Sequence, residues 1–252
     1  MIELRDVVVA YDTRVILDSV NLTIQDGETL VILGGSGSGK STLLRLLIGL
    51  QRPTSGQIIV DGVDVTTLSE EEFNKVRQKM GMVFQYSALF DSMSVGENVA
   101  FGLRAHTTLS DDEIMRIVSE RLGWVGLSGY ESYMPNELSG GMKKRVSLAR
   151  AIALDPTLIL YDEPSSGLDP ITSGTISMLI RGMQERLGCT SIVVTHDMQS
   201  AFYVADRIAL LDKGQFIEVS KTEDFKHSPN PKVQQFIHGE AEAIDIVTRR
   251  DI

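Results

Sequence analysis

The sequence predicts an α/β fold with an inserted helical lobe, and three observations support this prediction. An apolar strand at residues 30–33 runs into a glycine-rich loop and then into a helix. Strand and helix patterns alternate again from residue 158 to residue 219, which is typical of a parallel sheet. Between these parts, strand patterns vanish and helical patterns replace them. We therefore expect a core at residues 1–220, an inserted helical subdomain at about 86–155, and a C-terminal extension at 221–252.

The part of the chain before the glycine-rich loop has the patterns of β-strands. Residues 2–9 and 15–24 show partial alternation of apolar and polar side chains. Residues 26–28, with the sequence Asp-Gly-Glu, have the composition of a hairpin turn into the strand at 30–33. After the loop and its helix, the expected elements are a strand at 57–62, a charged helix at 70–79 and a short buried strand at 81–84.

The inserted lobe is expected to be helical throughout. Its helices are predicted at residues 95–104, 111–122 and 140–154. Ser110 with Glu113 three residues later forms a capping-box sequence, which places the start of the middle helix. Beyond the lobe, the expected elements are a strand at 158–162, helix 171–187, strand 191–195, helix 197–204, strands 207–211 and 215–219, and helix 231–239.

The glycine-rich loop at residues 34–41, GGSGSGKS, matches the phosphate-binding pattern G-x-x-x-x-G-K-[ST]. Glycines permit positive φ angles, so backbone N–H groups can surround phosphate oxygens at the positive end of the helix dipole. Lys40 can reach the β- and γ-phosphates, and the Ser41 hydroxyl can bind Mg²⁺. Because a strand and a helix flank the loop in the required order, the sequence predicts a nucleotide site rather than a plain surface turn.

Composition limits the classes of function. Hydrophobic residues make up 42% of the chain, which is enough for a sizeable core, and the net charge of −10 disfavours a role on nucleic acid. The one cysteine, Cys189, excludes an internal disulfide and a cysteine-based zinc cluster. Since no signal peptide or long apolar span is visible, we expect a cytoplasmic protein that reaches a membrane through a partner.

Two carboxylates follow the apolar strand at residues 158–162. Asp162 closes that strand and Glu163 comes next, at the end of a parallel strand where ligands bind in open sheets. Asp162 is expected to hold Mg²⁺ through water, and Glu163 to orient and deprotonate the water that attacks the γ-phosphate. Without the phosphate-binding loop, a pair of solvated turn residues before Pro164 would be the favoured interpretation; with the loop, the functional interpretation is favoured.

Two further polar residues stand at strand ends. His196 follows the strand at 191–195, where a parallel sheet would place it beside Glu163 and near the γ-phosphate. Gln85 follows the strand at 81–84 at the junction with the lobe, where its amide can contact both metal and water. Each residue alone is also compatible with an ordinary hydrogen-bonding role.

A second anion-binding pattern precedes the helix at 140–154. Ser139, Gly140 and Gly141 form a serine and glycine helix start, followed by the basic run 143–145. A capped helix with a solvated basic face explains the lysines but not the pair of glycines. Two phosphate cradles in one chain cannot both grip the same γ-phosphate unless one of them is supplied by another subunit.

In order and spacing, these motifs resemble the ABC-type ATPase family. The matching elements are the Walker A loop 34–41, the Q-loop residue Gln85, the signature 138–141, the Walker B strand 160–163, the D-loop 166–169 and the H-loop residue His196. The resemblance implies a P-loop NTPase (ABC ATPase) core with an N-terminal antiparallel β-subdomain and an inserted helical subdomain. Met142 departs from the glutamine that many relatives carry, and we expect this to change peripheral packing rather than catalysis.

The resemblance also implies a head-to-tail homodimer that holds two ATP molecules between the loop of one subunit and the signature of the other. Glu163, His196 and Gln85 are then the catalytic residues, and Ser41, Gln85 and Asp162 the Mg²⁺ ligands. Tyr11 resembles the aromatic residue that stacks on adenine. The residues assigned to the nucleotide are Tyr11, Gly34, Gly35, Ser36, Gly37, Ser38, Gly39, Lys40, Ser41, Thr42, Ser139, Gly140, Gly141 and Asp169.

Shorter motifs are similar to the MlaF-type ATPases of MCE-associated phospholipid transporters. They lie at residues 85–90, 93–100, 103–107, 169–172 and 230–239. This resemblance implies an integral membrane permease of the MlaE type, an MCE-domain protein outside the membrane, in some versions a small STAS-domain subunit, and a C-terminal contact with the neighbouring ATPase.

Other functions remain open at this point. One is a non-transport regulatory ABC ATPase that gates a cell-wall hydrolase or acts as an assembly factor. Another is the ATPase of an importer for a small polar solute. The motifs that bind and cleave ATP are shared by all of these, because the ATPase does not touch the cargo.

Overall fold

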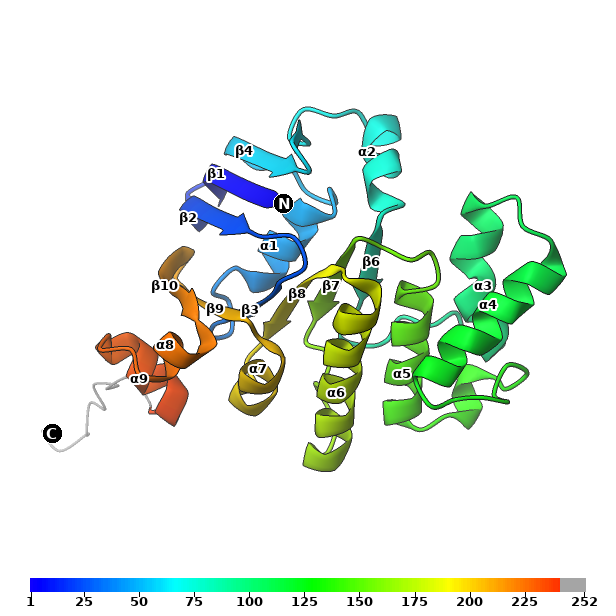
Figure 1. Cartoon of the computed structure of the whole chain (residues 1–252). Coiled ribbons are helices and arrows are strands. Elements are labelled where there is room, and N and C mark those ends of the chain that lie inside the picture. The colour runs from blue at the N-terminus through cyan, green and yellow to red at the C-terminus, as the bar shows by residue number, and fades with distance from the viewer. Residues whose placement is uncertain (241–252) are drawn as a thin grey trace, which may run out of the picture.

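The computed structural model describes residues 1–240 and shows two sheets with helices around them (Figure 1). A six-stranded sheet forms the centre, in the strand order β10-β9-β3-β8-β7-β6, and all its pairings are parallel except the edge pair β9 and β10. Its strands are β3 (Thr29–Leu33), β6 (Met80–Val83), β7 (Leu158–Asp162), β8 (Thr190–Thr195), β9 (Arg207–Asp212) and β10 (Gln215–Lys221).

A four-stranded antiparallel sheet covers one side of this centre, in the order β2-β1-β4-β5. The expected antiparallel β-subdomain is therefore present. Its strands are β1 (Ile2–Tyr11), β2 (Arg14–Ile24), β4 (Ser55–Val60) and β5 (Val63–Asp64).

The turn at residues 26–28 is not a hairpin, and the prediction was wrong there. β2 belongs to the antiparallel sheet, whereas β3 enters the central sheet between β8 and β9. All five residues of β3 are buried, and a strand buried on both faces is stabilised best inside a parallel sheet. The Asp-Gly sequence marks a change of direction between two sheets, with Gly27 at a φ of +74°.

Helices cover the other side of the central sheet and form the lobe (Figure 1). The capping box at Ser110 and Glu113 is present, because the Ser110 hydroxyl accepts from the Glu113 N–H and the Glu113 carboxylate accepts from the Ser110 N–H. Along the chain, the helices are α1 (Lys40–Leu47), α2 (Glu70–Arg77), α3 (Val95–His106), α4 (Asp111–Trp124), α5 (Gly140–Ala151), α6 (Pro170–Leu187), α7 (Met198–Val204), α8 (Thr222–Lys226) and α9 (Pro231–His238), with a 3₁₀ turn at Pro135–Glu137.

The lobe boundaries at 86 and 155 stay a prediction, because α5 packs both on α3 and α4 and on β6 of the central sheet. In the C-terminal part, α9 agrees with the expected helix at 231–239, and α8 was not expected. Residues 241–252 of the predicted extension lie outside the described residues.

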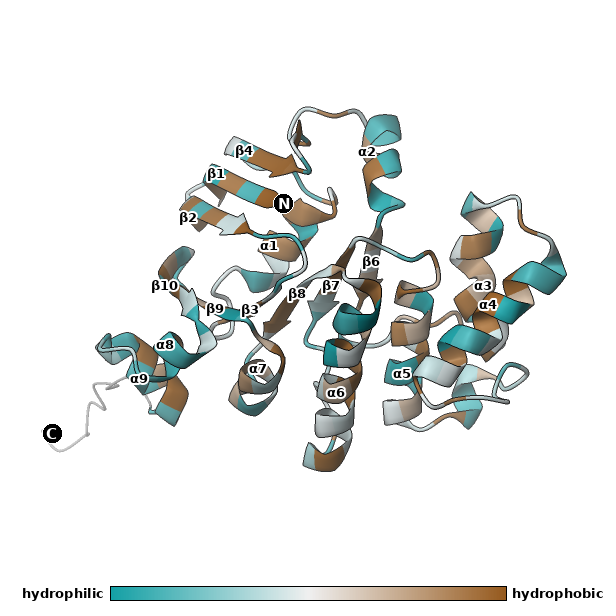
Figure 2. Ribbon diagram, viewed as in Figure 1, coloured by the Kyte–Doolittle hydropathy of each residue, from teal (hydrophilic) through white to brown (hydrophobic). Residues whose placement is uncertain are grey.

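The central strands separate two hydrophobic cores. In β3, Val31 and Leu33 belong to the core under the helices, and Leu30 and Ile32 to the core under the antiparallel sheet and α1. In the hydropathy view, β8 of the central sheet is largely brown, whereas α5 and α6 carry teal stripes (Figure 2). The strand that leads into the glycine-rich loop is therefore held from both sides.

Candidate ATP-binding and hydrolysis site

The loop at residues 34–39 connects β3 to α1 and requires glycine at two positions. A Cβ atom on Gly34 would lie 2.6 Å from Ser38 Oγ and would also collide with the Leu211 carbonyl oxygen. Gly39, at a φ of +111°, is the N-cap of α1, and a Cβ there would lie 2.7 Å from Leu17 Cδ2. These close approaches explain why the loop needs residues without side chains.

Lys40 begins α1 and folds back over the loop. Its Nζ donates to the carbonyl oxygens of Gly34, at 2.7 Å, and Gly35, at 3.0 Å. Burial lowers the pKa of Lys40, while Glu163 and Asp162 act in the opposite direction. The ammonium group is thus held at the mouth of the loop, where phosphate oxygens can replace the carbonyl oxygens as its acceptors.

The register of the parallel strands brings the predicted catalytic residues to one edge of the sheet. Leu33 pairs with Thr195, and Asp162 pairs with Val194, so β3, β7 and β8 end at the same level. Burial and the adjacent Glu163 raise the pKa of Asp162, while Arg45, Lys40 and Lys144 oppose them. Two carboxyl groups therefore lie close together at this partly buried edge, which suits a bound cation.

Glu163 has an unusual backbone conformation that aims its side chain at His196. Its φ is +46°, which costs a residue other than glycine roughly 1 kcal/mol or more, and its N–H donates to the Val194 carbonyl oxygen at 2.9 Å. The Glu163 side chain is only 13% exposed, and its Oε2 lies 2.9 Å from His196 Nδ1. Thr195 Oγ1 donates to the same oxygen at 3.3 Å. The structure thus places His196 beside Glu163, as the strand pattern predicted.

Gln85 lies just beyond β6 and faces the D-loop. Its Nε2 donates weakly to Ser166 Oγ at 3.4 Å. Two and three residues further on, Ser87 and Ala88 have φ angles of +62° and +46°, so the Q-loop backbone turns sharply after Gln85. The amide is close to the sheet edge that carries Asp162 and Glu163, because β6 pairs with β7.

The signature residues occupy a separate hollow. Ser139 caps α5 by accepting from the Met142 N–H at 3.3 Å, and a Cβ on Gly141 would lie 2.6 Å from Thr172 Cγ2. Asp169 caps α6 and accepts from the N–H groups of Ile171 and Thr172, both at 3.0 Å. Among the described residues that line this hollow, none belongs to the loop at 34–41. One chain therefore presents the two predicted phosphate cradles apart from each other.

Tyr11 and Thr42 lie at the margins of the site. Tyr11 ends β1, is paired with Arg14 and is 55% exposed, so its side chain is accessible to a base. Thr42 follows Ser41 in the first turn of α1. Their contacts with a nucleotide stay a prediction.

Sequence reasoning missed Lys144. The alternative of a solvated basic face is wrong for this residue, because Lys144 is only 5% exposed. Its Nζ donates to the carbonyl oxygens of Gln85 and Glu163, the latter at 3.4 Å. The available signal was helical spacing, since Lys144 shares a face of α5 with buried Ser147 and Leu148.

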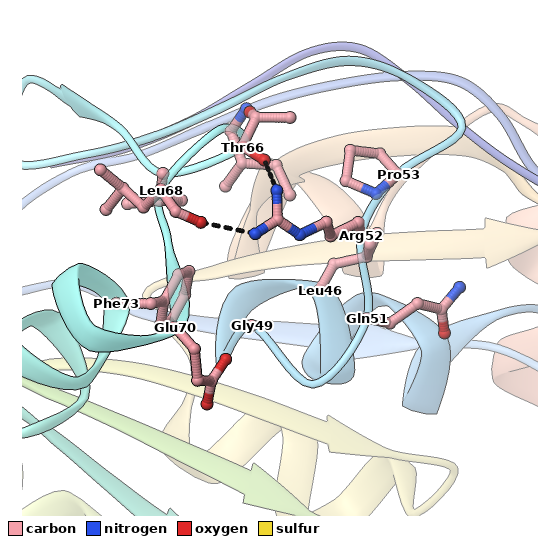
Figure 3. Close-up of a pocket in the computed structure, with 11 residues that line it drawn as sticks. Leu46, Gly49, Gln51, Arg52, Pro53, Thr66, Leu68, Glu70 and Phe73 are labelled. Carbon is pink, nitrogen blue, oxygen red and sulfur yellow. Dashed lines mark hydrogen bonds between the residues drawn. The ribbon is translucent and has the colours of Figure 1, made fainter.

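A smaller hollow near the antiparallel sheet has no part in this chemistry (Figure 3). Arg52 partly fills it, donating to the carbonyl oxygens of Thr66, at 3.2 Å, and Leu68, at 2.5 Å. Gly49, at a φ of +68°, passes so close to Phe73 that a Cβ would lie 2.6 Å from its ring. These contacts join α1 to α2 and serve the fold.

Comparison with known proteins agrees with this geometry. A family model described as ABC transporter matches residues 17–166, and the chain belongs to that family. It is an ABC ATPase, with ATP as its nucleotide. Among the described residues 1–240, none of the helices combines the length and apolar character needed to cross a bilayer.

Individual relatives cover nearly the whole chain. It is 44% identical over 242 residues to the intermembrane phospholipid transport system ATP-binding protein MlaF of Haemophilus influenzae, covering 96% of this chain and 92% of that protein. It is 43% identical to the probable ribonucleotide transport ATP-binding protein mkl of Mycobacterium tuberculosis, covering 94% of this chain and 66% of the longer relative.

Solved structures show the same fold. The dimeric ATP-binding cassette MJ0796, in a post-hydrolysis state with ADP and Pi, superposes with a TM-score of 0.82 at 35% identity, covering 88% of this chain and 99% of that one. The cbiO1 subunit of an ABC transporter complex from Clostridium perfringens has a TM-score of 0.83 at 32% identity, covering 90% of each chain.

Proposed function

We propose that this chain is the energising subunit of a transporter that moves phospholipid between membranes. The observation that supports this best is the similarity to intermembrane phospholipid transport ATP-binding proteins, which extends over 96% of the chain at 44% and 41% identity. Similarity of this extent includes the lobe and residues beyond the ATPase motifs, which are the parts that we propose to bind partners.

ATP cleavage is proposed to occur at the edge where β3, β7 and β8 end. Lys40 and the N–H groups of residues 34–41 bind the phosphates, and Glu163 takes a proton from the attacking water. His196, held 2.9 Å from Glu163, keeps that carboxylate in place and reaches toward the γ-phosphate. Gln85 orients the water from the Q-loop.

The donor set fits a magnesium ion. Ser41, Asp162 and Gln85 offer a hydroxyl, a carboxylate and an amide oxygen, and Mg²⁺ prefers a few such oxygens together with water and phosphate. Burial, and then the nearby Glu163, raise the pKa of Asp162. A cation bound beside the two carboxylates would stabilise their charged forms. When bound, the ion would neutralise charge on the phosphate oxygens.

Two copies are proposed to complete each reaction centre. Because the hollow around Ser139 holds none of the described residues of the phosphate loop, a second chain must bring its own loop to the Ser139, Gly140 and Gly141 cradle. The dimeric cassette of similar fold supports a head-to-tail arrangement. Asp169 then borders the nucleotide from the D-loop.

The lobe offers a surface for the permease. An open hollow on α3 is lined by Met93, Glu97, Phe101, Arg104 and Ala105, and Phe101 is 45% exposed. We propose that a cytoplasmic helix of an MlaE-like permease binds there, so that the chain lies on the inner face of the membrane. An MCE-domain protein outside the membrane and a small STAS-domain subunit would complete the assembly, and residues 230–239 would face the neighbouring ATPase.

Purification of the tagged chain from solubilised membranes tests this proposal. Mass spectrometry is expected to find a multi-span permease, an MCE-domain protein and phospholipid in the preparation. Phe101→Asp should lose all three, whereas Leu50→Asp, at a site that is 65% exposed and distant from α3, should keep them. Recovery of a soluble solute-binding protein in place of the MCE-domain protein would contradict the phospholipid proposal.

Transport of a small polar solute is the second candidate, and the 43% identity to the ribonucleotide transport relatives favours it. The same purification separates the two candidates, because only a phospholipid transporter is expected to retain lipid through repeated detergent washes.

A further inference from the structure

Lys144 is a buried cation whose nitrogen binds two main-chain carbonyl groups. Its side chain extends from α5 between the Q-loop and the Walker B strand and donates to the carbonyl oxygens of Gln85 and Glu163. Among the described residues, no carboxylate lies within 4.0 Å of its Nζ, although 5% exposure leaves it little water. Burying a charge without an ion-pair partner is costly, so this position requires an explanation.

Both carbonyl groups belong to backbone that is bent sharply. Glu163 has a φ of +46°, and Gln85 leads into Ser87 and Ala88 at +62° and +46°. Conformations of this kind persist only where neighbouring groups hold them. Lys144 supplies such a contact to both segments at once.

Arg150 makes a similar pair of contacts about 1.7 turns further along α5. Its guanidinium donates to the carbonyl oxygens of Ser87, at 3.0 Å, and Ala88, at 2.7 Å. Two cations on one helix therefore hold the Q-loop backbone, and of these two only Lys144 also reaches Glu163. This sharing makes Lys144 the direct link between the two segments.

The helix that carries Lys144 begins at the signature. Ser139 caps α5, and five residues of helix correspond to roughly 7 Å between this cap and Lys144. In the proposed dimer, Ser139 faces the ATP bound by the partner, so movement at the cap is transmitted along a rigid element to Lys144. Burial lowers the pKa of Lys144, and the nearby Glu163 and Asp162 oppose this, so its charge is felt at the reaction centre.

We propose that Lys144 is a positioning residue that holds the backbone of Glu163 and Gln85 in the hydrolytic arrangement and connects them to the signature end of α5. This inference rests on the proposed role of Glu163 as the general base. It assigns to the signature helix a second task, in the site of its own subunit, besides the contact with the partner's ATP.

Steady-state ATPase assays on the full chain test the proposal. Lys144→Met keeps the length of the side chain but removes the charge and the donors, and we expect kcat to fall about 10- to 100-fold, as for a misplaced catalytic group, while the KM for ATP changes by less than about threefold. Lys144→Arg should recover most of kcat. Lys143→Met is the matched control, since Lys143 is the half-buried neighbour whose side chain makes no hydrogen bond within residues 1–240.

Thermal unfolding and binding of a fluorescent ATP analogue show whether Lys144→Met folds. If it does not fold, Lys144→Gln replaces it, because the amide keeps one donor, and the same split between kcat and KM is expected. Unchanged kcat in a folded variant, or an equal loss in Lys143→Met, would overturn the positioning role.

A double-mutant cycle with Glu163→Gln separates this inference from the function it rests on. If Lys144 acts through Glu163, then Lys144→Met causes a smaller loss in the Glu163→Gln chain than in the unaltered chain, and the loss that remains acts through Gln85. A further 10- to 100-fold loss in the double variant contradicts positioning of Glu163. Full activity of Glu163→Gln by itself would instead contradict Glu163 as the base.

Discussion

The two halves of the proposed reaction centre are built in different ways. The strand-built half, which comprises Lys40, Gln85, Asp162, Glu163 and His196, follows the ends of paired strands and is fixed by their register. The helix-built half, which comprises Ser139, Gly140, Gly141 and Asp169, consists of two helix starts held by side-chain caps. One half is therefore positioned by the pairing of strands in the central sheet, whereas the other is positioned by the N-terminal caps of two helices that pack on that sheet.

The substitution with the largest expected effect on kcat disables the strand-built half. Glu163→Gln removes the general base and should lower kcat by about 10²- to 10⁴-fold, while ATP still binds and still closes the dimer. Phosphate release assays measure the rate, and gel filtration with ATP measures the dimer. Loss of ATP binding in this variant would place Glu163 in the binding of the nucleotide instead.

Two substitutions, one in each half, have the next largest expected effects and allow the two halves to be compared. Ser139→Ala should lower kcat by about 10²-fold, because a donor to the transferred phosphate is lost, and should leave ATP binding by the monomer intact. Lys40→Ala should weaken that binding about 10- to 100-fold through loss of a charge-assisted hydrogen bond. Titration of each monomer with a fluorescent ATP analogue distinguishes them. Equal weakening in both variants would show that Ser139 acts within its own chain.

A smaller effect is expected at Tyr11, which belongs to neither half. Stacking on adenine contributes about 1 kcal/mol, so Tyr11→Ala should raise the Kd for ATP about fivefold, and Tyr11→Phe should leave it unchanged. Binding of ATP and of GTP is measured in parallel. A Tyr11→Ala chain with ordinary affinity would return this residue to a purely structural role.

The smallest effect concerns stability and pH. Burial and Glu163 raise the pKa of Asp162 above its unfolded value, so the folded chain binds more protons and its stability falls as pH rises through that range. Asp162→Asn should therefore raise the melting temperature of the nucleotide-free chain at neutral pH, and this advantage should disappear below the ordinary pKa of aspartate. Calorimetry across pH measures it, and equal melting temperatures at neutral pH would show that Asp162 is already compensated.

Most of the strand-built half could be predicted from sequence because its signals are local. Continuous apolar runs ending in Asp162, Thr195 and Leu33 indicate parallel strands, and parallel strands bring their ends together. The glycine pattern at 34–41 fixes the loop for the same reason. The start of α4 could also be predicted, because its capping box, Ser110 and Glu113, lies within four consecutive residues.

What sequence could not supply depends on contacts distant along the chain. The Asp-Gly turn at 26–28 has the sequence of a hairpin turn. However, β3 is apolar on both faces and is therefore more stable inside the central sheet than paired with β2. Lys144 has the composition of a surface residue, and only the packing of α5 against the Q-loop makes it internal. Helix α8, with five residues, is too short to show a periodic pattern.

The alternation of β3 between two cores has a consequence for the response of the whole domain to nucleotide. Because Leu30 and Ile32 face one layer while Val31 and Leu33 face the other, opening the phosphate loop far enough to expose its strand requires both layers to separate. ATP bound at residues 34–41 should therefore slow amide hydrogen exchange in the antiparallel sheet and under α6 alike. Binding of ATP would therefore stabilise both layers of the domain together, as a single cooperative unit.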